Sequence, residues 1–205
     1  MAPRRRAAVE SARAKRALDL AIALPALIIL LPLLILICVA IRLDSRGPVI
    51  FRQRRIGLNG EPFDILKLRT MRVLENGEDF VQARKDDPRV TRVGALLRSS
   101  SLDEIPQLIN VVRGDMSLVG PRPHACAHEV VFEKHVPNYA LRRQVKPGIT
   151  GWAQIHGLRG PTPTTEIMRE RIAFDLWYAR HCRLALDLKI LARTPREVLR
   201  RRNAL

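Results

Sequence analysis

The stretch LAIALPALIILLPLLILICVAI, residues 20–41, contains no charged or polar side chain apart from the thiol of Cys38. Folded as a helix, these 22 residues would reach roughly 33 Å, enough to cross the hydrocarbon core of a bilayer. A helix on the surface of a soluble domain would carry a polar stripe at helical period, and this stretch has none. The sequence therefore predicts a membrane helix near the N-terminus.

Two prolines, Pro25 and Pro32, interrupt this helix. Pro32 has no N–H to donate and its ring crowds the carbonyl of Ile28, so we expect a sharp bend there. Arginines and lysines flank the apolar stretch on both sides, within residues 4–16 and 42–55. Because positive flanks tend to stay cytoplasmic, the pattern favours a re-entrant hairpin that breaks at Pro32 and returns to the side from which it entered.

Two alternatives to the hairpin stay open. Prolines are tolerated in transmembrane helices, so a kinked helix that spans the membrane also fits. A secretory signal peptide has an apolar core of roughly 7–15 residues, which is shorter than this segment. The chain beyond the segment also lacks the cysteine usage of secreted proteins, which favours an anchor over a signal peptide.

The composition excludes several classes of protein. Lys and Arg number 36 against 20 Asp and Glu in 205 residues, so the net charge is +16. This charge requires an anionic partner, which is a nucleic acid, a phosphorylated substrate or an anionic membrane. An aromatic content of 4% leaves few surfaces on which bases stack, so we expect no nucleic acid partner. Three cysteines without a Cys-x-x-Cys pair argue against a disulfide framework and against a zinc site built on cysteines.

The chain divides into two parts. Residues 1–46 form a basic N-terminus with the re-entrant membrane helix, and residues 47–205 form a small cytosolic domain. We expect this domain to be α/β and rich in helices, with amphipathic helices on its surface. The predicted elements are short strands near 49–51 and 63–68, a loop or exposed helix over 75–89, an amphipathic helix from Leu102 to Val112, a helix through Val131 and a basic helical region over 166–202.

Two adjacent acids, Asp103 and Glu104, are the strongest chemical signal. A structural explanation exists, because Ser101-x-x-Glu104 matches a capping box. Pro106 weakens it, since a helix that began at Ser101 would lose a hydrogen bond there, and it favours Asp103 as the N-cap. In both cases the carboxylates would lie beside free backbone N–H groups, a natural site for a phosphate and its divalent metal. A carboxylate held against a metal-bound diphosphate acts as a nucleophile and forms an acyl phosphate.

Several cations near these acids are candidate phosphate ligands, although each could also be a solvated surface charge. They are Lys67, Arg69, Arg98, Arg122 between Pro121 and Pro123, and Lys146. The five histidines lack the spacing of a zinc hydrolase. Glycine-rich phosphate loops are absent from the sequence, which argues against a P-loop kinase and a Rossmann dehydrogenase.

The order of the motifs resembles the bacterial sugar transferases, the monotopic phosphoglycosyl transferases that act on polyprenyl phosphate. The matching segments extend over residues 15–195. They are KRALD at 15–19, GPVIFRQ at 47–53, KLRTM at 67–71, RSSSLDEIPQL at 98–108, GDMSLVGPRP at 114–123, KPGITGWAQ at 146–154 and LDLKI at 186–190.

This resemblance implies an enzyme of the bacterial inner membrane whose catalytic domain faces the cytoplasm. It implies transfer of a sugar-1-phosphate from a UDP-sugar to undecaprenyl phosphate, with release of UMP, as the first membrane step of exopolysaccharide or capsule assembly. PRPHA at 121–125 and the segment around Trp152 are most similar to the hexose branch, which favours glucose or galactose. Anionic lipid is an expected partner, and a homo-oligomer stays open.

The resemblance also assigns residues. Asp103 matches the nucleophile that forms a covalent phosphosugar intermediate, and Glu104 matches the second acid, associated with Mg²⁺. Further matching positions for substrate binding are Lys67, Arg69, Arg98, Pro121, Arg122, Pro123, Lys146, Gln154 and Asp187. The hairpin departs from the small members of the family, which often carry Ser-Pro at the break where this chain has Leu31-Pro32.

Two rival functions remain. A non-enzymatic basic protein on the membrane surface would bind anionic lipid or nucleic acid through its +16 charge. A phosphatase would use Asp103 through the same acyl phosphate and release free phosphate.

Overall fold

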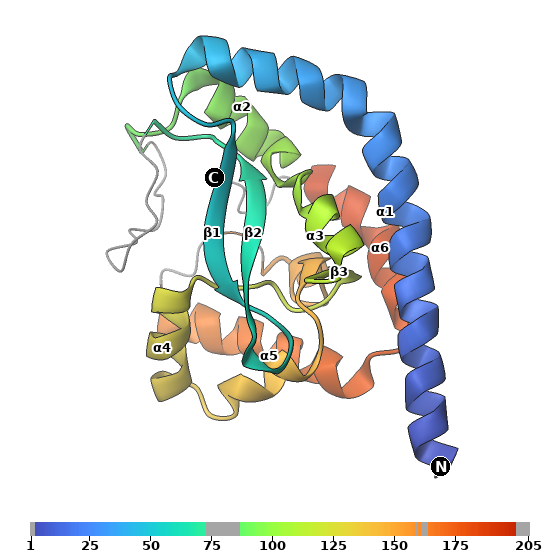
Figure 1. The fold of residues 1–205 in the computed structure, drawn as a ribbon. Coiled ribbons are helices and arrows are strands. Elements are labelled where there is room, and N and C mark those ends of the chain that lie inside the picture. The colour runs from blue at the N-terminus through green and yellow to red at the C-terminus, as the bar shows by residue number, and fades with distance from the viewer. Residues whose placement is uncertain (1–2, 73–86, 159, 161–163, 200–205) are drawn as a thin grey trace.

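The computed structural model describes residues 3–72, 87–158, 160 and 164–199. Its first element is α1, Pro3–Asp44, a single long helix that rises along one side of the domain and bends over its top (Figure 1). Pro25 and Pro32 lie inside this helix and account for a bend, because each removes one backbone hydrogen bond. Where the sequence predicted two helices joined at a break, the structure has one bent helix, so the re-entrant placement stays a prediction.

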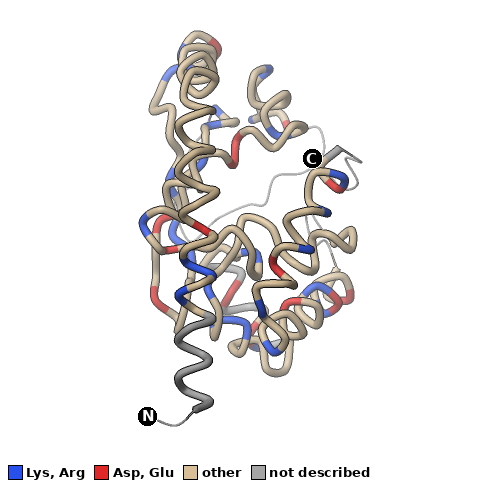
Figure 2. The backbone as a smooth tube through the Cα atoms, turned by 90° about the vertical axis from the view of Figure 1, so that its right-hand side faces the viewer, with Lys and Arg blue, Asp and Glu red and all other residues tan. Residues whose placement is uncertain are grey.

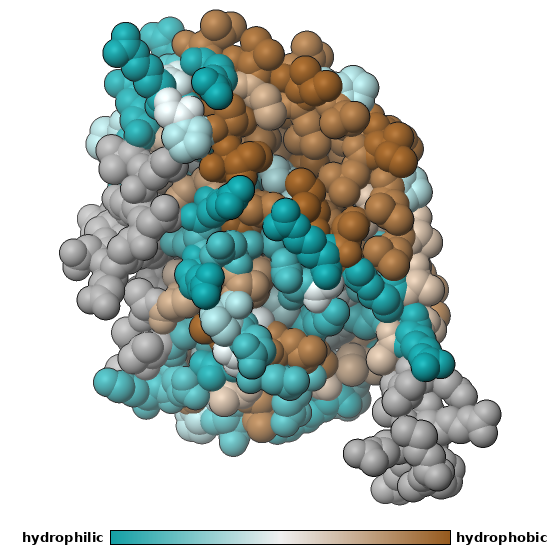
Figure 3. All heavy atoms as spheres, viewed as in Figure 1, coloured by the Kyte–Doolittle hydropathy of each residue, from teal (hydrophilic) through white to brown (hydrophobic). Residues whose placement is uncertain are grey.

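The middle of α1 is apolar and exposed. Within it, Ala12–Asp44 is long and apolar enough to cross a membrane, and only 11% of its most apolar 18-residue stretch is buried. Figure 2 shows that this middle part carries no acidic or basic residue, and Figure 3 shows apolar atoms gathered over it. Side chains such as Ile28, Ile29 and Leu36 lie open to the surroundings, as expected for a helix whose apolar face contacts lipid.

A β-hairpin follows α1. Strand β1, Ile50–Ile56, pairs antiparallel with β2, Pro62–Leu68, and Ile50 lies opposite Leu68. The turn contains η1, Leu58–Gly60, in which Asn59 and Gly60 adopt positive φ. Both predicted strands are confirmed, and both extend beyond the predicted residues.

The region from Leu102 to Val112 is not one amphipathic helix. Helix α2, Arg92–Ser100, ends at Ser101, which has a left-handed backbone with φ 61°. A 3-10 turn, η2, Leu102–Glu104, comes next, and α3, Gln107–Arg113, begins only after Pro106. The predicted N-caps at Ser101 and Asp103 are therefore wrong for α3, because Pro106 occupies that position.

A small parallel pair of strands consists of β3, Ser117–Val119, and β4, Gly148–Thr150, and it is contacted by α1, α3 and α6, Leu184–Leu199. The remaining elements are α4, Cys126–His135, η3, Tyr139–Gln144, η4, Gln154–His156, and α5, Thr165–His181. The helical region predicted over 166–202 is thus two helices. Among the described residues the chain is helix-rich with a few strands, as predicted.

The core of the domain includes α1. Ala23 of α1 belongs to the same buried cluster as Val111 of α3, Met116 and Ile190 of α6. A second cluster joins Ile37 and Ile41 to Leu97 of α2. The membrane helix is therefore part of the fold rather than a separate tether. Most of the loop or helix predicted over 75–89, and the basic residues 200–202, lie outside the described residues.

Candidate active site

Asp103 and Glu104 lie on η2, in the short connection between α2 and α3. The left-handed Ser101 ends α2 and turns the chain, so the two acids follow directly after the turn. Asp103 is only 9% exposed, and the Glu104 side chain is 12% exposed. Buried carboxylates need compensating partners, and the two acids differ sharply in how they obtain them.

Glu104 is held by two cations from distant segments. Lys67 of β2 donates from Nζ to Oε1 at 2.9 Å. Arg122, which follows β3, donates from Nη1 to Oε2 at 3.2 Å and from Nη2 to Oε1, which makes a bidentate pair. Burial alone would raise the pKa of Glu104, but Arg122 and Lys67 together hold it well below its usual range. Glu104 is therefore ionised at neutral pH.

Asp103 has the opposite environment. Its carboxylate accepts no hydrogen bond from the side chains that the structure describes. Burial raises the pKa of Asp103 and the neighbouring Glu104 adds to the effect, while Lys67, Arg122 and Arg98 oppose it, leaving a pKa of about 6. Two adjacent acids whose pKa values are driven apart are typical of a pair with different chemical roles.

The backbone around Arg122 is fixed at three consecutive carbonyls. Gly148 donates its N–H to the carbonyl of Pro121 at 2.9 Å. Arg142 donates from Nη2 to the carbonyl of Arg122, and Arg55 donates from Nη1 to that of Pro123 at 3.0 Å. Since Pro121 and Pro123 also restrict φ, the Arg122 guanidinium is presented to Glu104 from a rigid segment.

Arg142 in turn belongs to a buried polar network. It donates to Asp175 at 2.8 Å and to Glu129 at 3.3 Å, and Glu129 accepts from the Tyr139 hydroxyl at 2.7 Å. Burial and the nearby Arg142 hold the pKa of His124 well below its usual range, so His124 is neutral. Sequence patterns gave no sign of Arg55 and Arg142, because their partners are backbone carbonyls and acids far along the chain.

The other predicted cations fall into different places. Arg98, near the end of α2, is close enough to lower the pKa of Asp103. Arg69 is buried at the end of α1, where Nη2 donates to the carbonyls of Ser45 at 2.6 Å and Ile41 at 3.3 Å. These contacts give Arg69 a structural role at the junction between α1 and β2, whatever else it binds.

Lys146 and Asp187 belong to a second polar cluster at the base of α1. Asp187 of α6 accepts from Lys15 at 2.6 Å and from the Tyr178 hydroxyl at 2.6 Å. Lys15 also donates to the carbonyl of Val119 at 3.0 Å. Burial and Arg16 lower the pKa of Lys146, which lies near this cluster. Lys15 lies in the matching motif at residues 15–19, but the sequence alone does not reveal its contact with Asp187.

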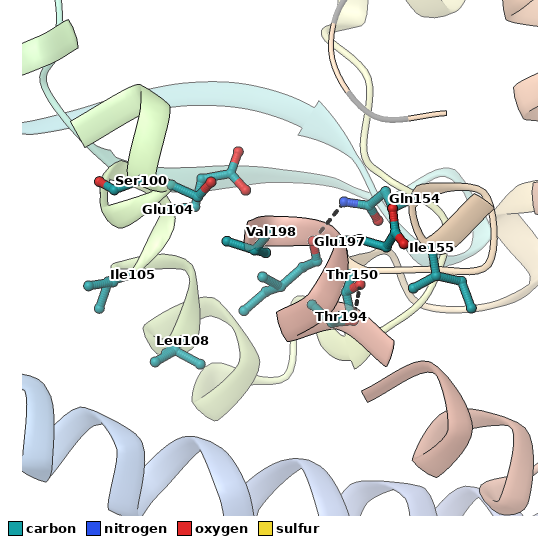
Figure 4. A pocket seen from close by; sticks show the side chains of 12 residues that line it. Ser100, Glu104, Ile105, Leu108, Thr150, Gln154, Ile155, Thr194, Glu197 and Val198 are labelled. Atoms are coloured by element: carbon teal, nitrogen blue, oxygen red, sulfur yellow. Dashed lines mark hydrogen bonds between the residues drawn. The ribbon is translucent and has the colours of Figure 1, made fainter. Parts of the chain in front are cut away.

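Gln154 lines a pocket beside Glu104. The pocket has a volume of about 280 Å³ and lies between α2–α3 on one side and β4, η4 and α6 on the other (Figure 4). Gln154 donates from Nε2 to the carbonyl of Ile149 at 3.0 Å, and its Oε1 is buried without a partner. The site thus brings together Asp103, Glu104, Lys67, Arg122 and Gln154, with Arg98 close by.

A magnesium ion shared with a phosphorylated substrate would be held by these two acids. No group of three or more His, Cys, Asp and Glu side chains gathers among the described residues. Mg²⁺ in phosphoryl transfer sites is held by one or two carboxylates and takes its other ligands from phosphates and waters. Asp103 and Glu104 supply that number of oxygen donors in one turn of chain.

Comparison with known proteins agrees with these features. A family profile described as bacterial sugar transferase matches residues 10–201. A Caulobacter vibrioides protein named UDP-glucose:undecaprenyl-phosphate glucose-1-phosphate transferase is 54% identical over 190 residues, 93% of this chain and 71% of the relative. An Escherichia coli protein of the same name is 51% identical over 177 residues, 86% of this chain and 38% of the relative.

A third relative is close to this chain in length. The exopolysaccharide production protein PSS of Rhizobium leguminosarum bv. phaseoli is 45% identical over 181 residues, which cover 86% of this chain and 90% of the relative. The chain thus spans less than half of the Escherichia coli protein and most of the other two. The family profile covers nearly the whole sequence, and the matched range contains the paired acids together with the cations that bind Glu104. This chain therefore belongs to the bacterial sugar transferase family.

Proposed function

We propose that this protein transfers glucose-1-phosphate from UDP-glucose to undecaprenyl phosphate and releases UMP. The observation that carries the proposal is the Asp103–Glu104 pair, in which an ionised Glu104 holds Lys67 and Arg122 beside an acid with a raised pKa. The names of the Caulobacter vibrioides and Escherichia coli relatives support undecaprenyl phosphate as acceptor and favour glucose over galactose. The name of the PSS protein supports a role in exopolysaccharide production.

The reaction proceeds in two displacements at one phosphorus atom. An Asp103 carboxylate oxygen attacks the β-phosphorus of UDP-glucose, and the bond from that phosphorus to the bridging oxygen breaks, so UMP leaves with the electron pair. A phosphate oxygen of undecaprenyl phosphate then attacks the same phosphorus. The bond to Asp103 breaks, and the product is a lipid-linked diphosphosugar.

The surrounding residues have separate tasks in this scheme. Lys67 and Arg122 are already oriented by Glu104, so they stabilise phosphate charge without having to reorganise. Arg98 adds a further positive charge near Asp103. Mg²⁺, held by Asp103 and Glu104, would neutralise charge on the diphosphate and the departing UMP.

The membrane placement follows from α1. We infer that the enzyme lies in the bacterial inner membrane with its catalytic domain in the cytoplasm. The exposed apolar middle of α1 and its positive flanks support this placement, and the bend in α1 suits a helix that enters and leaves the same leaflet.

The proposed function is tested by UMP release from UDP-glucose with undecaprenyl phosphate and Mg²⁺. The detergent-solubilised full chain is compared with Asp103→Asn, with Asp64→Asn as control because Asp64 is an exposed acid of the β1–β2 hairpin. We expect release that needs the lipid and Mg²⁺, is abolished in Asp103→Asn and persists in Asp64→Asn.

Other outcomes point to specific alternatives. Release of free phosphate without a lipid-linked product would indicate a phosphatase. Faster release from UDP-galactose than from UDP-glucose would correct the donor. Full activity of Asp103→Asn would overturn the assigned nucleophile.

A further inference from the structure

The pocket beside Glu104 is a second chemical environment within the site. Figure 4 shows Ser100, Glu104, Ile105 and Leu108 on one side of it and residues of β4, η4 and α6 on the other. Its aliphatic side chains are Ile105, Leu108, Ile149, Ile155 and Val198. Most of the surface that its walls expose is apolar.

The described lining of the pocket supplies no cation to a diphosphate. None of its lining residues in the described part of the chain is Lys or Arg, and Glu104 at its edge is an acid. Two cations, Lys67 and Arg122, donate to Glu104 at the edge of the pocket. The arrangement suits a ligand with an apolar chain and an anionic head, where the head meets the cations and the chain lies in the pocket.

An exposed apolar residue of α2 also lies one helical turn from this pocket. Leu96 of α2 is 67% exposed, although its neighbour Leu97 packs against Ile37 and Ile41 of α1. Ser100, which lines the pocket, lies one helical turn after Leu96 and donates its hydroxyl to the Leu96 carbonyl at 2.7 Å. Figure 3 shows apolar atoms gathered over the top of the molecule, where α1 bends over the domain.

We propose that this pocket binds the first isoprene units of the polyprenyl phosphate acceptor and so places the acceptor phosphate beside Glu104. This inference rests on the proposed function, since it assumes a polyprenyl phosphate as acceptor. At about 280 Å³ the pocket is near the lower end of the ~300–1,000 Å³ typical of small-molecule sites, so it holds only the beginning of a long lipid. The remainder of the chain stays in the bilayer beside α1.

The test changes the pocket at α6, whose residues lie far from Asp103 and Glu104 in the sequence. Val198→Trp on α6 adds bulk to the pocket, Val198→Ala removes apolar contact, and Ala192→Trp is the control because Ala192 is exposed on the same helix and does not line the pocket. UMP release is measured with varied undecaprenyl phosphate and separately with varied UDP-glucose. Retention of undecaprenyl phosphate by each solubilised protein is measured by native mass spectrometry, without UDP-glucose.

We expect Val198→Trp to raise the KM for undecaprenyl phosphate about tenfold or more, and Val198→Ala to raise it less, because both lose apolar burial of the lipid. The KM for UDP-glucose, and both constants in Ala192→Trp, stay at wild-type values. Lipid retention falls in parallel in Val198→Trp.

Each contrary result has its own meaning. A higher KM for UDP-glucose alone would assign the pocket to the donor sugar and overturn the inference, as would unchanged kinetics and retention in both Val198 variants. A wild-type chain that retains the lipid but releases no UMP would overturn the proposed function and leave the pocket assignment standing.

Discussion

Glu104 receives hydrogen bonds from Lys67 and Arg122, whereas Asp103, one residue earlier, receives none from the described side chains. The two cations keep Glu104 ionised, whereas burial leaves Asp103 with a pKa of about 6. A carboxylate of higher pKa is also the more basic nucleophile, and it is mostly ionised one pH unit above its pKa. We therefore expect Asp103, the proposed nucleophile, to react near neutral pH.

The pH dependence of kcat/KM reports this arrangement. Asp103 must be ionised to attack, so we expect UMP release to fall as the pH drops through about 6. Lys67 lowers the pKa of Asp103. In Lys67→Met, the fall in activity on the acid side of the pH–rate profile (the acid limb) should therefore shift to higher pH by about 1 pH unit or more. The measurement is a pH–rate profile, with Arg54→Met as control because Arg54 is exposed on the same hairpin. An acid limb that stays in place in Lys67→Met would mean that another group controls it.

The raised pKa also predicts an effect on stability. An acid whose pKa is raised on folding destabilises the folded state at pH values above its unfolded value, because the buried charge is disfavoured. Asp103→Asn should therefore raise the free energy of unfolding by up to about 3 kcal/mol at pH 7.5, since one pKa unit corresponds to about 1.4 kcal/mol. The gain should shrink as the pH falls below about 6 and should vanish well below 3.8, where Asp103 is protonated in both states.

Denaturant unfolding of the solubilised wild type and Asp103→Asn, at pH 7.5 and at acidic pH, measures this change in the free energy of unfolding. Asp64→Asn, at an exposed acid, should show no comparable gain. A less stable Asp103→Asn at pH 7.5 would mean that the Asp103 carboxylate is stabilised in the fold.

At the scale of elements, α2 is fixed by one close contact. A Cβ at Gly94 would lie 2.1 Å from the Thr70 carbonyl oxygen and 2.7 Å from its carbon, both backbone atoms. Thr91, the N-cap of α2, also donates its N–H to that oxygen at 3.1 Å. The end of β2 and the start of α2 therefore touch with no room for a side chain.

We expect Gly94→Ala to lower the free energy of unfolding by about 1–3 kcal/mol, because α2 must move away from Thr70. Activity should fall as well, since α2 leads directly into Asp103. The opposite substitution at the exposed neighbour, Ala95→Gly, should lose only about 1 kcal/mol through helix propensity. Thermal unfolding and UMP release compare the two variants, and an unchanged Gly94→Ala would contradict the close contact.

Local patterns predicted some elements and missed others for physical reasons. The hairpin strands and the apolar helix follow from hydropathy over neighbouring residues, and both were found. The helix predicted from Leu102 failed because the left-handed Ser101 and the proline at 106 break it into a turn and a shorter helix. The acids were evident as a sequence motif, but Arg142 and Arg55 act on backbone carbonyls about 20 and 70 residues away, which no local pattern contains.

At the scale of the whole molecule, we expect two forces to hold the protein on a membrane. The apolar part of α1 would be buried in hydrocarbon, and the +16 charge would attract anionic lipid. Charge attraction weakens with salt, whereas burial of α1 does not.

We therefore expect the full chain to float with neutral and with anionic vesicles at low salt, with tighter binding to the anionic ones. High salt should remove the difference between the two and leave binding to both. Flotation at low and high salt measures this. Loss of all binding at high salt would mean that α1 does not insert and that only charge holds the protein to the surface.

The contacts at the base of α1 have a practical consequence for anyone who wants a water-soluble form of the enzyme. Asp19 accepts from the Ser117 hydroxyl and the Leu118 N–H, Lys15 pairs with Asp187, and Ala23 is fully buried in the main core. Truncation at the start of β1 would remove Lys15, Asp19 and Ala23. Strand β3 would lose the acceptor Asp19, Asp187 would lose its ion pair, and the main core would lose a buried side chain. Solubility has to be gained by replacing the exposed lipid-facing side chains between Ile28 and Val39, with the inner face of the helix left intact.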